Sequence, residues 1–133
     1  LSFSLQKPEK YIAFSSTEKH VGVGFIDTKG HHVEGMQTFS YYFLNEQKLI
    51  AYSGDLAEPE ILFNSLEVLP AQERLVFHEM TYESNKAHTL YSELNRFTSR
   101  YKIYGYHNNP LLKPDDCEIP LVYDSQYYIK GNA

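Results

Sequence analysis

The stretch IAYSGDL, residues 50–56, decides how the rest of the chain is interpreted. Its first three residues favour a strand, and they lead directly into a Ser-Gly-Asp turn that ends on Asp55. Gly and Asp commonly end strands, so a solvated turn aspartate is the simplest interpretation. The carboxyl end of a strand is also where an α/β sheet gathers its functional groups, so a metal ligand is the second interpretation of Asp55.

The segments around this stretch predict an α/β fold. Residues 59–69 have helical apolar spacing and begin with Pro59, a helix-start signal. The β-α-β-α-β order from 48 to 107 predicts a mixed sheet with helices on one face, in a single domain over 1–133. In full, the pattern predicts strands at 10–16, 20–28, 37–44, 48–53, 74–82, 101–107 and 121–129, helices at 59–69 and 88–97, and a proline-containing loop at 108–120.

Composition narrows the class of protein. The chain has 133 residues, of which 42% are hydrophobic and 15% aromatic, which argues against disorder and for one packed core. The net charge of −5 argues against an extended nucleic-acid surface. Cys117 is the single cysteine, so neither an internal disulfide nor a cysteine-based zinc cluster can form.

No membrane span or signal peptide is visible, so we expect a cytoplasmic protein without a membrane partner. Because the chain begins at Leu1, we expect a fragment or a processed product.

Several polar residues fall at the predicted strand ends. Asp55 follows one strand, His107 ends another, and the pair His31 and His32 precedes the strand at 37–44. We expect His32, Asp55 and His107 to converge at one sheet edge, where imidazole and carboxylate groups suit zinc, manganese or iron. The alternatives are an exposed histidine pair in a loop and a turn histidine at 107.

Two further histidines have competing interpretations. His78 lies inside an apolar strand, where a histidine is usually a hydrogen-bonded part of the core. His88 opens the predicted helix at 88–97, where it either helps to cap the helix or faces the same sheet edge.

Five segments, taken in order, resemble the second half of the metallo-β-lactamase fold, and most closely its tRNase Z-like branch. They are HVEGMQTFSYYF (32–43), YSGD (52–55), VFHEMTY (76–82), AHTLYSELNRF (87–97) and IYGYH (103–107). VYDSQYYI (122–129) is similar to the closing strand of that fold, and the resemblance covers residues 20–129.

The chain also departs from the family pattern. SGDL replaces Ser-Gly-Asp-Thr, HEMTY replaces His-Glu-Ala-Thr-Phe, and HTL replaces His-Ser-Thr. The His-X-His-X-Asp-His motif of the family's first half does not occur in this chain. The resemblance therefore implies a C-terminal half of the fold, which forms one half of a four-layer αβ/βα sandwich.

The resemblance also implies site roles. Asp55 would bridge two divalent metal ions, zinc first and manganese or iron as alternatives, with His32 on one ion and His107 on the other. His88 would act as a catalytic group near the leaving oxygen, and His78 and Glu79 would orient the ligands. The site would be incomplete in this chain alone.

The implied function is part of a metal-dependent hydrolase of phosphodiesters, active when an N-terminal half completes it. The substrate would be RNA, processed at its 3′ end, or a small cyclic nucleotide; the acidic balance and the lack of a Lys/Arg cluster favour the small one. The alternatives are a metal-free, degenerate module that acts as a structural or binding subunit, and a binding domain with a tyrosine-lined pocket. As a half-sandwich exposes an apolar sheet face, we expect pairing with the missing half or with a second copy as a dimer.

Overall fold

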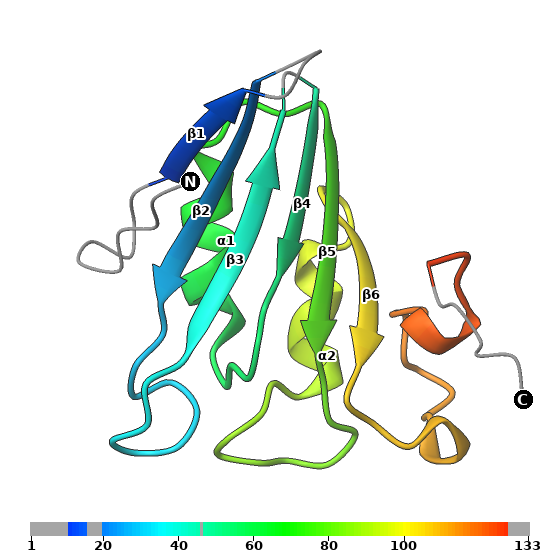
Figure 1. The fold of residues 1–133 in the computed structure, drawn as a ribbon. Helices are drawn as coiled ribbons and strands as arrows, with labels where there is room; N and C mark the ends of the chain where they lie inside the picture. The colour runs from blue at the N-terminus through cyan, green and yellow to red at the C-terminus, as the bar shows by residue number, and fades with distance from the viewer. Residues whose placement is uncertain (1–10, 16–19, 46, 128–133) are drawn as a thin grey trace, which may run out of the picture.

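The computed structural model describes residues 11–15, 20–45 and 47–127. Within them, one sheet has the strand order β1-β2-β3-β4-β5-β6, so each strand lies beside its neighbour in sequence (Figure 1). Neighbouring strands from β1 to β4 pair antiparallel, and β4, β5 and β6 run parallel. The strands are β1 (Tyr11–Ser15), β2 (His20–Asp27), β3 (Phe39–Leu44), β4 (Lys48–Tyr52), β5 (Glu73–Glu79) and β6 (Lys102–Tyr106).

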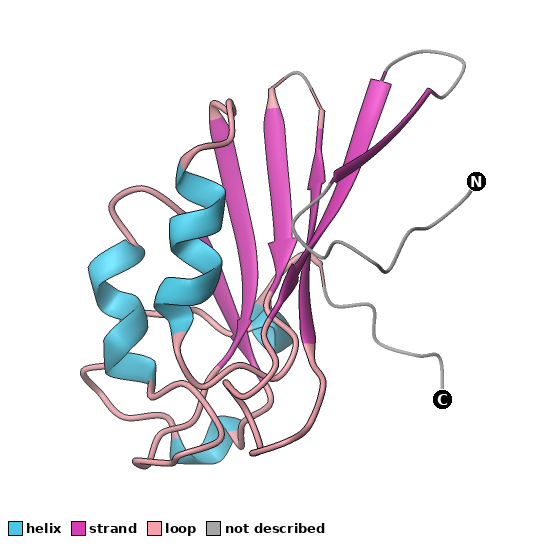
Figure 2. Ribbon diagram, turned by 90° about the vertical axis from the view of Figure 1, so that its left-hand side faces the viewer, coloured by secondary structure: helices cyan, strands magenta, loops and turns pink. Residues whose placement is uncertain are grey.

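Two helical segments cover one face of this sheet (Figure 2). Helix α1 (Pro59–Glu67) begins at the predicted proline and buries Leu62, Phe63 and Leu66. Helix α2 (Tyr91–Leu94) is only one turn long and continues as the 3₁₀ helix η1 (Asn95–Phe97). The predicted mixed sheet with helices on one face is therefore confirmed.

The core lies between the sheet and these helices. Leu49 and Ala51 of β4, Val76 of β5 and Ile103 of β6 are at most 2% exposed and belong to one apolar cluster with the buried face of α1. Burial of such side chains stabilises the layer by about 25 cal/mol per Å² of apolar surface. The parallel β4-β5-β6 unit is thus held rigidly, with the three carboxyl ends at one edge.

The opposite face of the sheet is aromatic: Tyr127 packs on Phe77 and Tyr104 at its β5-β6 end, and its β3-β4 end is exposed. The register places Tyr41 opposite Tyr52, Tyr52 opposite Phe77, and Phe77 opposite Tyr104, so these rings share one face. Tyr41 and Tyr52 are 42% and 46% exposed, and the neighbouring Phe43 is 47% exposed. An exposed apolar face of this kind is typical of a surface that packs against another layer.

Two predicted elements differ from the structure. The strand predicted at 121–129 is wrong over residues 121–127, because Val122–Asp124 form the 3₁₀ helix η3 and, of these described residues, only Leu121 pairs with the sheet, through an isolated bridge to Gly105. The Ser125 hydroxyl donates to the Val122 carbonyl at 2.7 Å, a local bond that favours a turn over a strand. Residues 128 and 129 lie outside the described residues, as do residues 10 and 16 of the first predicted strand.

The second difference concerns the helix predicted at 88–97. Residues 80–90 form an extended loop, closed by a bridge between Thr81 and Leu90, and the helix begins only at Tyr91. Within the predicted loop at 108–120, Pro110–Leu112 form a short 3₁₀ helix, η2. No helix in the described part of the chain is long and apolar enough to cross a membrane.

Candidate metal centre

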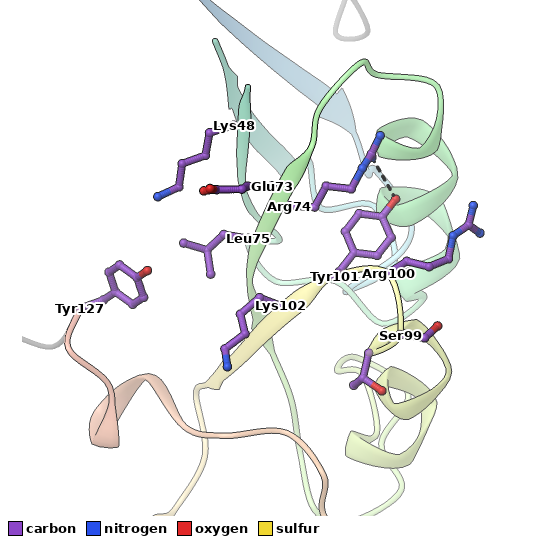
Figure 3. Close-up of a pocket in the computed structure, with 10 residues that line it drawn as sticks. Lys48, Glu73, Arg74, Leu75, Ser99, Arg100, Tyr101, Lys102 and Tyr127 are labelled. Atoms are coloured by element: carbon purple, nitrogen blue, oxygen red, sulfur yellow. Dashed lines mark hydrogen bonds between the residues drawn. The ribbon is translucent and has the colours of Figure 1, made fainter. Parts of the chain in front are cut away.

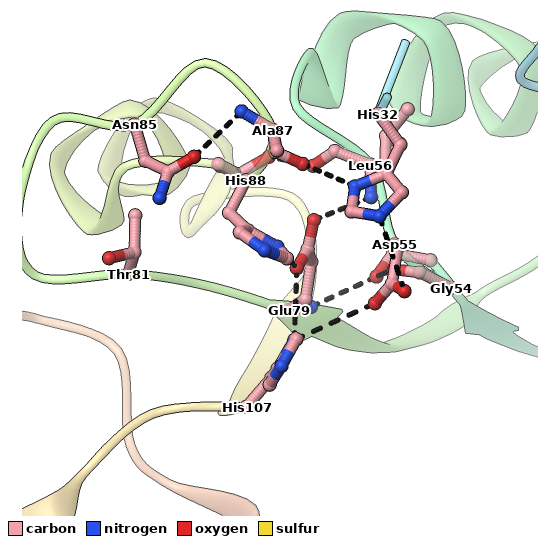
Figure 4. A network of polar contacts seen from close by, with 12 residues as sticks. His32, Gly54, Asp55, Leu56, Glu79, Thr81, Asn85, Ala87, His88 and His107 are labelled. Carbon is pink, nitrogen blue, oxygen red and sulfur yellow. Dashed lines mark hydrogen bonds and ion pairs between the residues drawn. The ribbon is translucent and has the colours of Figure 1, made fainter. Parts of the chain in front are cut away.

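The carboxyl ends of the three parallel strands bring the polar residues together. Asp55 follows β4, Glu79 is the last residue of β5, and His107 follows β6 directly. His32, from the loop between β2 and β3, and His88, from the loop after β5, approach the same edge (Figure 4). Five side chains from five segments of the chain therefore lie around one point at the edge of the sheet.

Asp55 lies at the centre of this group. Its Oδ1 lies 3.6 Å from His107 Nδ1, and its Oδ2 lies 3.6 Å from His32 Nε2. The preceding Gly54 has a φ of 62°, and a Cβ there would lie 2.5 Å from the Phe39 carbonyl oxygen, so only glycine fits the turn. The Ser-Gly turn thus holds the carboxylate with one oxygen toward each of the two histidines.

Tyr106 supports this turn from the end of β6. Its hydroxyl donates to the Gly54 carbonyl at 3.1 Å and lies 3.0 Å from the Ser53 hydroxyl. Burial raises the pKa of Tyr106, so the phenol stays protonated as a donor. Sequence reasoning missed this residue, which could have been found from its place just before His107 at the strand end.

The His32 ring has a defined tautomer. Its Nδ1 lies 2.7 Å from the Ala87 carbonyl oxygen, which can only accept, so Nδ1 carries the proton. In the neutral ring Nε2 then presents a lone pair to the Asp55 carboxylate at 3.6 Å. Two acceptors that face each other repel unless a cation lies between them, and this distance is too long for a charge-assisted hydrogen bond of about 2.7–2.9 Å. The pair is arranged as two ligands of one cation would be.

Glu79 supports the two other histidines from a buried position. Its carboxylate is fully buried, and Oε1 accepts a hydrogen bond from the Leu56 amide at 2.5 Å. Oε2 bonds His88 Nδ1 and lies 3.3 Å from His107 Nδ1. Burial raises the pKa of Glu79, while the hydrogen bond from His88 acts in the opposite direction. The structure thus gives Glu79 the contacts expected of a residue that orients metal ligands.

The donor set fits a divalent metal. Asp55, Glu79, His88 and His107 each offer one ligand atom, and these atoms lie within 4.8 Å of one another. Zinc bonds of about 2.0–2.1 Å would place two ligand atoms about 3.4 Å apart in a tetrahedral shell. The 3.3 and 3.6 Å separations around His107 agree with that spacing. These residues could therefore hold a metal ion, and its identity and number stay predictions.

His88 occupies a different setting from the one predicted. Because α2 begins three residues later and is four residues long, His88 does not open a helix and has no helix-end charge beside it. Its ring lies between those of His32 and His107, with centroids 5.0 and 4.8 Å away. The side chain is 24% exposed, so it lies at the surface of the group.

His31 and His78 point elsewhere. His31 Nδ1 lies 3.0 Å from Glu58 Oε2, so of the histidine pair His32 is the one that reaches Asp55. His78 is fully buried on the helix side, stacked on Phe63 at 5.8 Å, and its Nδ1 lies 2.7 Å from the Glu79 carbonyl oxygen. Burial lowers the pKa of His78 to about 4, so it is neutral near pH 7. Its contacts fit a core histidine that touches the metal centre only through the backbone of Glu79.

A basic cavity lies at the other edge of the sheet (Figure 3). It has a volume of about 420 Å³, and its lining includes four cationic residues that lie far apart in the sequence: Lys48, Arg74, Arg100 and Lys102. The fold therefore forms the Lys/Arg cluster that the sequence does not reveal. Arg74 donates to the Leu66 carbonyl and Arg100 pairs with Glu67, so half of this charge already serves to hold α1.

Comparison with known proteins shows the fold. No family model matches the chain, and no curated protein matches its sequence. The solved structure of the isothiocyanate hydrolase from Delia radicum gut bacteria superposes with a TM-score of 0.55 at 12% identity, over 87% of this chain and 48% of that chain. The chain thus spans about half the length of that hydrolase. The similarity confirms the predicted fold class, one half of a metallo-β-lactamase-type sandwich.

Proposed function

We propose that this chain is the second half of a metal-dependent hydrolase that cleaves phosphodiesters, related to the tRNase Z-like branch. The observation that carries the proposal is Asp55, whose two oxygens face His107 and His32 across the same 3.6 Å. A hydrolase with the same fold agrees with it at the level of the fold alone.

In this proposal, different residues of the chain bind the metal ions and transfer a proton. Asp55, His32 and His107 would hold two divalent ions, which when bound supply Lewis-acid activation of the phosphoryl group and of water. Glu79 fixes the ring of His88 through its Nδ1 atom, which leaves the Nε2 atom of His88 available on the other side. His107 turns its Nδ1 atom toward both Asp55 and Glu79, so Nδ1 is its proposed ligand atom. Ala87 fixes His32 in the same way through its carbonyl.

His88 is the proposed general acid. As the bond from phosphorus to the leaving oxygen breaks, that oxygen needs a proton, and His88 Nε2, the ring nitrogen that does not contact Glu79, can donate it from the protonated ring. The ring is partly exposed and lies between the other two histidines of the group. General acid help of this kind accelerates a reaction by about 10²–10⁴-fold.

In this proposal, the exposed sheet face is the surface that binds the partner. The aromatic face that includes Tyr41, Phe43 and Tyr52 would pack on the first half of the sandwich, which would also bring the remaining metal ligands. The share of the neighbour that this chain matches, 48%, leaves room for such a half. Association with a second copy of this chain is the competing outcome.

One observation favours the metal-free alternative, a degenerate module that acts as a structural or binding subunit. Asp55 and Glu79 both have histidine partners within ion-pair distance, so protonated histidines would balance the carboxylates without a metal. Hydrolysis of bis(4-nitrophenyl) phosphate by the complete protein, with and without a chelator, separates the two. Turnover that the chelator abolishes and added zinc or manganese restores supports the hydrolase; no turnover with any metal supports the alternative.

A further inference from the structure

A cavity beside His107 adds a specificity element to the proposed site. It has a volume of about 350 Å³, within the range of small-ligand pockets, and lies where the carboxyl end of β6 meets the segment that contains η3. Its lining includes Tyr106, His107, Asn108, Leu121, Val122 and Tyr123. His107 therefore borders both the metal centre and this cavity, so a group bound here would lie next to the reacting atoms.

The backbone fixes the position of the cavity. The Gly105 amide donates to the Pro120 carbonyl at 2.9 Å, and Gly105 and Leu121 form a bridge, so the segment after residue 119 is attached to β6. His107 has a φ of 65°, the only positive φ among the described non-glycine residues. A left-handed histidine is uncommon and is typical of functional sites, and here the turn places the ring between the two sites.

The lining selects against charge and for a flat ring. Apart from His107, the lining residues carry no ionisable group that is charged near pH 7. Tyr106 and Tyr123 provide aromatic surface, and Leu121 and Val122 provide aliphatic surface. Aromatic walls favour flat rings, since stacking contributes more than area alone.

Asn108 contributes one directional group. Its Oδ1 accepts a hydrogen bond from the Tyr82 hydroxyl at 3.2 Å, which fixes the amide. Its Nδ2 is buried and has no hydrogen-bond partner among the described residues. An unpaired buried donor is costly, and Asn108 lines both this cavity and the neighbouring one beside Tyr82, so an acceptor on a group bound here would be its partner.

From these observations we propose that the cavity binds a neutral aromatic ring that carries a hydrogen-bond acceptor, attached to the scissile group of the substrate. A nucleobase and a substituted phenyl ring both have this chemistry. The inference rests on the proposed hydrolase function for its place in turnover, but the binding itself does not depend on activity.

The test separates binding from turnover. Adenosine, benzamide and cyclohexanecarboxamide are titrated into the ¹⁵N-labelled protein, and amide shifts are followed by NMR. We expect adenosine or benzamide to shift the Asn108, Leu121 and Tyr123 signals, and the non-planar cyclohexanecarboxamide to leave them in place. Binding by benzamide alone identifies a phenyl ring, and binding by adenosine indicates a nucleobase.

Variants assign the binding to the lining. Tyr123→Ala should weaken binding about tenfold through lost stacking, and Asn108→Ala about fivefold through a lost hydrogen bond. Tyr127→Ala is the matched control, because Tyr127 is similarly exposed but lines the basic cavity at the other edge. If Tyr123→Ala does not fold, Tyr123→Leu and Asn108→Asp replace the two test variants, with the same expected losses.

These experiments distinguish a failure of the cavity proposal from a failure of the proposed function. Ring binding that these variants weaken, in a protein that hydrolyses no phosphodiester with any metal, supports the cavity and overturns the function. A protein that hydrolyses phosphodiesters but binds no ring overturns the cavity proposal and keeps the proposed function. In that case the ratio of KM for aryl to KM for methyl phosphodiesters is the same in wild type and in Tyr123→Ala. Equal effects of Tyr123→Ala and Tyr127→Ala on ring binding also overturn the cavity proposal.

Discussion

His32 Nε2 faces Asp55 Oδ2 across 3.6 Å, while Nδ1 of the same ring is committed to the Ala87 carbonyl. On the other side of the carboxylate, His107 lies at the same distance from Oδ1. One carboxylate therefore lies between two imidazoles, with one oxygen for each. This is the arrangement expected where a carboxylate is shared between two cations, and the following predictions test it.

Replacing His88 should separate catalysis from metal binding. In the complete protein, His88→Ala should lower kcat about 10²–10⁴-fold, because the leaving oxygen loses its proton donor, and should leave the metal content nearly unchanged. Steady-state kinetics and elemental analysis of the same sample measure both. His31→Ala is the control, since His31 pairs with Glu58 outside the group. Full activity in His88→Ala would refute the general-acid role, and a loss of metal would identify His88 as a ligand or a structural residue.

Glu79→Gln should weaken metal binding without removing the proposed ligands. The variant keeps the shape of the side chain but loses the negative charge that orients His88 and His107. Loss of such an orienting group typically costs about 10–100-fold in metal affinity, which competition with a chromogenic chelator measures. Glu83→Gln, an exposed position in the same loop, should change nothing. Unchanged zinc affinity in Glu79→Gln would show that the buried carboxylate does not support the site.

His78 should make stability depend on pH. Burial lowers its pKa to about 4 in the folded protein, against about 6.5 in the unfolded chain, so between these values the unfolded state binds more protons. The free energy of unfolding should therefore decrease as the pH falls from about 6.5 to about 4, by about 3 kcal/mol in total. Urea titrations at a series of pH values measure this decrease.

The control for this prediction is His78→Phe, which keeps the stacking on Phe63 and removes the titrating group. Glu79 contributes with the opposite sign, because its raised pKa favours the folded state at low pH and this contribution is lost as the pH rises. Both proteins contain Glu79, so the difference between their pH profiles isolates His78. Parallel profiles would contradict the prediction.

The aromatic sheet face should control association. We expect this chain alone to self-associate, because Tyr41, Phe43 and Tyr52 expose apolar surface on one face. Phe43→Ser should shift sedimentation toward the monomer. Leu111→Ser, at a residue that is 91% exposed in η2, removes as much apolar character elsewhere and should have no effect. A stable wild-type monomer at high concentration would show that the face needs no partner.

The sequence was sufficient to place the ends of the parallel strands. A strand that ends in Ser-Gly-Asp and another that ends in histidine lead to the same edge when both strands are parallel, so the proximity of Asp55 and His107 follows from topology. His32 could be placed only by resemblance, because a loop position has no periodicity that fixes its direction.

Other features depend on contacts that the sequence does not encode locally. The bond between Glu79 and His88 forms because the loop 80–90 folds back on β5, whereas the apolar spacing of 88–97 predicted a helix. Lys48, Arg74, Arg100 and Lys102 are separated in sequence and meet only because they lie near the starts of neighbouring parallel strands. The segment at 121–127 alternates like a strand, yet its serine and aspartate form local turns.

The most direct test of the central claim is the metal content of the complete protein, in wild type and in Asp55→Ala. We predict about two divalent ions per site in the wild type, as in two-metal hydrolases. Asp55→Ala should lose both metal and activity, because the Asp55 carboxylate turns one oxygen toward His32 and the other toward His107. Elemental analysis after dialysis against zinc-buffered solution gives the number. A wild type that retains no metal, or an Asp55→Ala protein that retains as much as the wild type, would contradict the account.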